Sequence, residues 1–168
     1  MSSVQPSAHR PHVAGVAGGV GVTTIAHALR GHDAGIHRGQ SIEILVCRAT
    51  SESLVRAAHA IGRLDQQPIL AVNCTDSGRP GRAVMTRLHM IAPHTARTVL
   101  LPHVDHWRAL SKPLDAVREL VDSPRRDLGR QARRWAEAVE QIAGATPRIA
   151  STIVPLPAGG VLLPERPR

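Results

Sequence analysis

The segment GVAGGVGVTT, residues 15–24, decides the fold of this chain. It follows an apolar run, residues 12–17 (HVAGVA), and precedes a stretch, residues 23–29, with apolar side chains at helical spacing. The order is therefore strand, glycine-rich turn and helix. Glycines let successive backbone N–H groups point at one anion, and a helix N-terminus adds the positive end of its dipole. The segment predicts an anion-binding turn; the alternative is that its glycines only let the strand and the helix pack closely.

Apolar strands alternate with amphipathic helices along the rest of the chain. This order predicts an α/β fold with a mostly parallel sheet and helices on both faces. The expected strands are 12–17, 41–47, 68–73 and 97–101, and the expected helices are 23–29, 51–64 (capped by Thr50 or Ser51), 81–91, 113–122 and one that starts at Ser123-Pro124.

The chain divides into a core and two polar or proline-rich ends. Residues 1–11 are predicted to form a disordered leader, residues 12–143 a single α/β domain, and residues 144–168 a Pro/Gly-rich tail. Residues 31–40 are predicted to be a loop. Its only carboxylate is Asp33, and we expect no strand to position that side chain.

The composition limits the classes of function. The core must use Val, Ile, Leu and Ala, because the chain has only two tryptophans and no Phe or Tyr. A net charge of +8 is compatible with DNA binding or with a solvated surface typical of a GC-rich genome. The chain lacks a polybasic block and the aromatic residues that stack on bases, which argues against specific binding of single strands.

Cysteine usage and hydropathy indicate a cytoplasmic protein. Cys47 and Cys74 form no CxxC, so we expect neither a zinc motif nor a disulfide framework, and we interpret them as structural. The N-terminus has no apolar signal region, and no run approaches about 18 apolar residues. His103 and His106 could form part of a metal site, but ten histidines make that spacing a weak signal.

Four predicted loops should meet at one edge of the sheet. Ligands of parallel α/β folds bind at the carboxyl ends of the strands. The loops are 17–24, 47–50, 73–76 and 102–105.

The glycine-rich turn resembles a known phosphate loop. GGVGVTT, residues 18–24, is similar to the deviant loop of the ParA/MinD group of P-loop ATPases, whose pattern is KGGxGK[ST]T. Val22 replaces the lysine that reaches the β- and γ-phosphates, and Ala17 replaces the signature lysine of the group. The positions that agree are Gly18, Gly19, Gly21, Thr23 and Thr24.

Later segments extend this resemblance over about residues 13–120. IEILVCRATSESLVRAAHAIGRL resembles a strand and helix of the group, and ILAVNC resembles the next strand, whose asparagine, here Asn73, reads adenine. VLLPHVDHWRAL resembles the segment that packs on the base, which implies Pro102 and Asp105. The short loop 31–40 stands where the group carries its switch regions and catalytic aspartates. The resemblance thus implies a shortened P-loop NTPase-like fold, closest to the pilus-localisation branch.

The resemblance implies a function without hydrolysis. Each missing charge contact costs a phosphoryl-transfer site on the order of 10²–10³ in rate, so we expect no catalytic residues and no ATPase activity. The leading hypothesis is an interaction or regulatory module of partition, positioning, pilus or conjugation machinery, with a protein partner. One alternative is a switch that binds ATP or ADP with Mg²⁺ and forms a homodimer. The other is a basic DNA-binding accessory protein of a mobile element.

Overall fold

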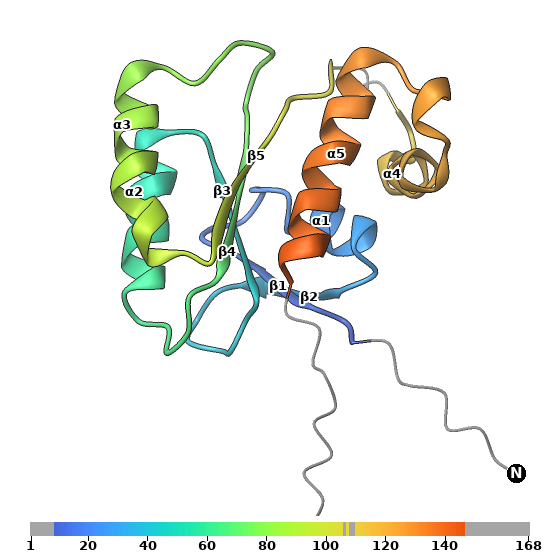
Figure 1. The fold of residues 1–168 in the computed structure, drawn as a ribbon. Coiled ribbons are helices and arrows are strands. Elements are labelled where there is room, and N and C mark those ends of the chain that lie inside the picture. The colour runs from blue at the N-terminus through green and yellow to red at the C-terminus, as the bar shows by residue number, and fades with distance from the viewer. Residues whose placement is uncertain (1–8, 106, 108–109, 147–168) are drawn as a thin grey trace, which may run out of the picture.

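The structure is a five-stranded parallel sheet between two layers of helices (Figure 1). It is a computed structural model that describes residues 9–146, except 106, 108 and 109. Most of the predicted leader and tail, residues 1–8 and 147–168, therefore lies outside the described residues. The strand order is β2-β1-β3-β4-β5, and all four pairs are parallel. The strands are β1 His12–Gly15, β2 His32–Ile36, β3 Ile44–Arg48, β4 Ile69–Asn73 and β5 Arg97–Leu101.

Helices cover both faces of this sheet, which confirms the predicted α/β class. Figure 1 shows α2 and α3, in green tones, on one face, and α1, α4 and α5, in blue and orange, on the other. The helices are α1 Val22–Ala28, α2 Ser51–Ile61, α3 Arg82–Ile91, α4 Pro113–Asp122 and α5 Arg130–Ala145, with short 3-10 turns η1 Ala92–His94 and η3 Arg125–Asp127.

The core is split into two layers by the alternation of side chains along the strands. Ile44 of β3 packs in the layer under α1, α4 and α5, whereas the next residue, Leu45, packs in the layer under α2 and α3. Both are fully buried. In the absence of Phe and Tyr, Trp135 of α5 is the largest fully buried side chain of the described residues. Continuous apolar strands are expected where helices cover both faces of a parallel sheet.

Local signals place the start of α2. The Thr50 hydroxyl accepts a hydrogen bond from the backbone N–H of Ser53 at 3.3 Å, so Thr50 is the N-cap. Ser53 is itself buried, and its hydroxyl accepts from the N–H of Arg48 at 2.9 Å. The helix ends at Ile61, short of the predicted residue 64. These bonds tie the end of β3 to the first turn of α2.

The prediction that residues 31–40 form only a loop is wrong. His32–Ile36 is strand β2, which pairs with β1 in the register His12↔His32 and Val13↔Asp33. None of the residues of this edge strand is buried, so it lacks the apolar pattern by which the other strands are recognised. As a consequence, a strand does position Asp33, next to the glycine-rich turn.

The helix predicted from Ser123-Pro124 begins later. A 3-10 turn, Arg125–Asp127, comes first, and α5 starts at Arg130 after Gly129. The backbone of Leu128 and Gly129 is extended, with ψ of 137° and 161°. The extended link therefore interrupts the helical run that the apolar spacing of α5 suggests.

Two neighbouring residues of α2 test this packing. Leu54 is fully buried, whereas Val55 is 43% exposed. We expect Leu54→Ala to lower the free energy of unfolding by about 2–5 kcal/mol, because it removes buried apolar contacts and leaves a cavity. Val55→Ala should cost less than about 1 kcal/mol. Urea denaturation followed by circular dichroism measures both; equal losses would contradict the assignment of the buried face.

Candidate functional site

The turn after β1 adopts a conformation that needs glycine. Gly19 and Gly21 have φ of 71° and 102°, in the left-handed region that L side chains rarely adopt. A Cβ atom at Gly21 would lie 2.4 Å from Nδ2 of Asn73, whereas one at Gly18 would meet nothing within 4 Å. Gly21 is thus fixed both by its backbone angle and by the close approach of β4.

Side chains at the ends of two neighbouring strands hold the carbonyl groups of this turn. Arg48 Nη2, at the end of β3, donates to the Gly19 oxygen at 2.7 Å. Asn73 Nδ2, at the end of β4, donates to the Val20 oxygen at 2.7 Å. By contrast, the backbone N–H groups of Gly18, Gly19 and Gly21 donate to no other described residue. The turn therefore keeps a set of unused donors, which is the arrangement that an anion-binding loop requires.

A hydroxyl and a carboxylate meet beside the turn. Thr23 Oγ1 in the first turn of α1 donates to Asp33 Oδ2 at 2.7 Å. The other oxygen, Asp33 Oδ1, accepts from the N–H of Gly35 at 2.9 Å, which fixes the orientation of the carboxylate. Because Asp33 lies in β2, the expectation that no strand positions it is wrong.

A cleft of about 490 Å³ opens at the carboxyl ends of the strands. It joins the predicted residues Gly19, Gly21, Thr24, Asn73 and Pro102, together with Arg48, Cys74 and Thr75. Its far wall contains both tryptophans of the chain, Trp107 and Trp135, whose rings meet edge to face at 4.7 Å. The four predicted loops thus contribute to one region, although not every predicted residue faces it.

The remaining predicted residues lie around this cleft. Gly18 lines a separate depression next to Arg48. Thr23 and Asp33 line a third hollow of about 460 Å³ beside α1. Val22 is half-buried and packs against the core layer under α1.

Asp105 does not line the cleft. Its carboxylate accepts from Gln131 Nε2 of α5 at 2.9 Å and lies 3.2 Å from His103 Nε2. The side chain is 61% exposed. Asp105 therefore ties the segment after β5 to α5.

Arg48, Trp107 and Trp135 are cleft residues that the sequence interpretation did not select. Arg48 falls inside one of the four predicted loops, but nothing in the sequence distinguishes it from other arginines. Trp107 and Trp135 lie 28 residues apart on segments that only the packing of α5 on β5 brings together. Their rarity in the chain was the single available signal.

The described residues contain no cluster of three or more His, Cys, Asp or Glu side chains that could hold a metal ion. His106 lies outside the described residues, and His103 contacts Asp105. A pair made of one hydroxyl and one carboxylate nevertheless suits Mg²⁺, which commonly takes one or two protein carboxylates and completes its shell with phosphate oxygens and water. Thr23 and Asp33 fit that donor set, in a hollow that is also lined by Arg10, Arg30 and Arg118.

Both cysteines are held as neutral thiols. Burial raises the pKa of Cys47 to about 12. Burial and the charge of Asp76 raise the pKa of Cys74. Neither has the lowered pKa of a reactive thiolate, which agrees with a structural role.

Comparison with known proteins adds no relative: no protein-family model, no curated protein and no solved structure matches the chain. The resemblance to the ParA/MinD group therefore rests on the segments quoted above and stays a prediction. Among the described residues, no helix is long and apolar enough to cross a membrane.

Two glycine substitutions test the conformation of the turn. We expect Gly21→Ala to lower the free energy of unfolding by about 1–3 kcal/mol, through left-handed backbone strain and loss of the bond from Asn73 to Val20. The matched change Gly18→Ala should stay within about 0.5 kcal/mol. The double variant with Gly21→Ala and Asn73→Ala should lose less free energy of unfolding than the sum of the losses of the two single variants. Additive losses in urea denaturation would contradict the close contact.

Thiol reactivity tests the burial of the cysteines. Because burial favours the neutral thiol, the contribution of Cys47 to stability is present below its ordinary pKa of 9.0 and is lost as the pH rises toward about 12. At mildly alkaline pH, a disulfide reagent should modify Cys47 only after unfolding and Cys74 slowly in the native protein. Cys74→Ser should abolish the native reaction. Rapid modification of both thiols in the native protein would be incompatible with this account.

Proposed function

We propose that this protein is a P-loop-like module that binds a nucleotide with Mg²⁺, does not hydrolyse it, and regulates a protein partner through its occupancy. The observation that carries the proposal is the hydrogen bond between Thr23 and Asp33 at 2.7 Å, beside a turn with unused N–H donors. P-loop proteins hold magnesium between a loop Ser or Thr and a strand Asp. Thr23 and Asp33 offer the same two kinds of group, which supports the proposal.

The phosphate groups would meet the turn at residues 18–24. Backbone N–H groups would supply the hydrogen bonds, and Thr23 and Asp33 would hold the magnesium, whose chemistry when bound is to neutralise phosphate charge. Arg48 supplies a positive charge beside Gly19. Val22, which stands at the lysine position of the loop, supplies no charge. Since Arg48 extends from a neighbouring strand, this charge does not depend on the lysine position of the loop.

The base would occupy the cleft between Asn73 and the tryptophans. Pro102 and Trp107 offer apolar surface for a planar ring, and aromatic rings stack on such surfaces. The Asn73 amide also donates to the Val20 oxygen, so its own oxygen remains as an acceptor. This arrangement favours a base with an exocyclic amine.

The same geometry argues against hydrolysis. Among the described residues, Asp33 is the only carboxylate that lines the hollow next to Thr23, and its two oxygens are engaged by Thr23 and Gly35. No second carboxylate there activates a water. A bound nucleotide would therefore persist and act as a stable signal, which suits a regulatory module better than a motor.

Calorimetric titration with ATP, ADP and Mg²⁺ tests this function. We expect ATP binding that strengthens with magnesium and is weakened about tenfold to hundredfold by Asp33→Asn, because a charged ligand of the metal is lost. Emission of Trp107 and Trp135, which wall the cleft, should change on binding. No phosphate release should accompany it.

Glu137→Gln is the matched control, since it neutralises an exposed carboxylate of α5 and should leave the affinity unchanged. Arg48→Gln keeps a donor for the Gly19 oxygen but removes the charge, so it should weaken ATP more than ADP. The absence of any heat or fluorescence change at millimolar nucleotide would refute the proposal.

A further inference from the structure

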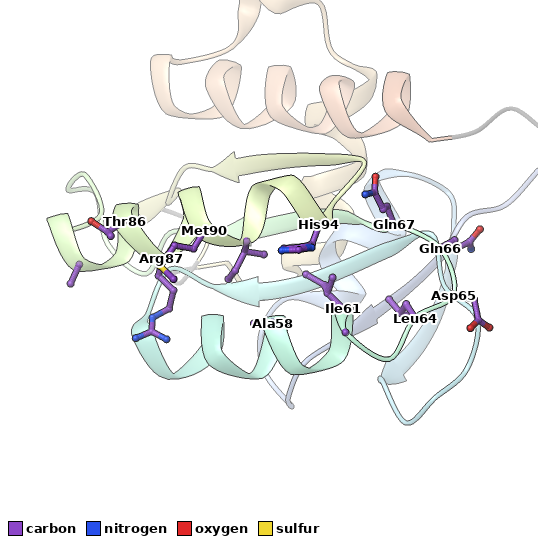
Figure 2. A pocket seen from close by; sticks show the side chains of 13 residues that line it. Ala58, Ile61, Leu64, Asp65, Gln66, Gln67, Thr86, Arg87, Met90 and His94 are labelled. Carbon is purple, nitrogen blue, oxygen red and sulfur yellow. The ribbon is translucent and has the colours of Figure 1, made fainter.

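A hollow lies away from the glycine-rich turn, between α2 and α3 (Figure 2). It has a volume of about 640 Å³. Its walls are mainly apolar, with Ala58 and Ile61 from α2 and Met90 and Ile91 from α3. We call it the α2–α3 groove.

Met90 stands at the edge of this groove and is 71% exposed. It is the most exposed of the large hydrophobic side chains of the described residues. A single exposed apolar side chain needs no explanation, but here it adjoins an apolar hollow of matching chemistry. Methionine is flexible and fills irregular gaps, so it suits insertion into such a hollow.

Opposite charges mark the two ends of the groove. Figure 2 shows Arg87 of α3 at one end and Asp65, just after α2, at the other. Both side chains are exposed, and neither forms an ion pair or hydrogen bond with another described residue. The groove thus has an apolar centre and one free charge of each sign at its ends.

We propose that a second copy of this chain docks on the α2–α3 groove about a two-fold axis. In a two-fold interface one surface patch meets itself, so each contact between two different residues occurs twice. The axis would bring Arg87 against Asp65 of the partner subunit and would insert Met90 into the partner's groove. A surface with unpaired charges of opposite sign at its two ends is complementary to its own rotated copy, whereas a partner with a single sign of charge would satisfy only one end.

This dimer does not depend on the nucleotide site. The α2–α3 groove lies on the face of the sheet opposite α1, the helix that carries Thr23 (Figure 1). Self-association through it therefore leaves the cleft of each copy open, and it should proceed without nucleotide.

Sedimentation velocity over micromolar to submillimolar protein, without nucleotide, tests the proposal. We expect a monomer–dimer equilibrium that Met90→Glu weakens by about tenfold or more, because it places a charge in an apolar contact. His89→Glu is the matched control, an exposed change on the same helix at a position outside the groove, and should leave the equilibrium unchanged. Circular dichroism should show that both variants stay folded.

A charge exchange then tests the pairing. Arg87→Asp and Asp65→Arg should each weaken the dimer, and combining them should restore it, because the two ends exchange signs. A monomer at every concentration would overturn the proposal, as would binding of a different protein to the groove without self-association. A dimer insensitive to Met90→Glu, or a double variant no better than the single ones, would overturn it as well.

Discussion

Parallel pairing of the strands is the constraint on which the candidate site depends. Because every strand of the sheet runs in the same direction, the ends of β1, β3 and β4 reach one edge together. Arg48 and Asn73 are the last residues of β3 and β4, and each donates a hydrogen bond to one carbonyl of the turn that follows β1. The turn is thus shaped by its neighbours in the sheet as much as by its own glycines.

The chemistry proposed for the site follows from the polar and charged groups that it contains. A nucleotide needs hydrogen-bond donors for its phosphates, a metal ligand and some positive charge. In the proposed site the turn supplies the donors, the Thr23–Asp33 pair supplies the metal ligand and Arg48 supplies the charge. Hydrolysis also needs a positioned water. Among the described residues, the hollow beside Thr23 is lined by no second carboxylate that could activate one. The proposed function is therefore binding without turnover.

Sequence patterns predicted the buried parts well and the exposed parts poorly. Strands β1, β3 and β4 are apolar runs buried on both faces, and β5 is an apolar run with Val99 and Leu101 buried; hydropathy reveals such runs directly. Strand β2 has no buried residue, so its backbone pairing left no trace in the pattern, and the loop assigned to residues 31–40 was wrong. The same error hid the role of Asp33. Likewise, only the hydrogen bond from its guanidinium to the Gly19 oxygen distinguishes Arg48 from the other arginines of the chain.

The most direct test of the central claim is an NMR titration of isotope-labelled protein with ATP and Mg²⁺, followed through the backbone amide signals. Binding in the proposed manner predicts the largest shifts at residues 18–24, with smaller ones at Asp33 and Asn73 and at the indole signals of Trp107 and Trp135. Shifts confined to the α2–α3 groove, or unchanged amide signals at saturating nucleotide, would contradict the account and leave the glycine-rich turn as a packing element alone.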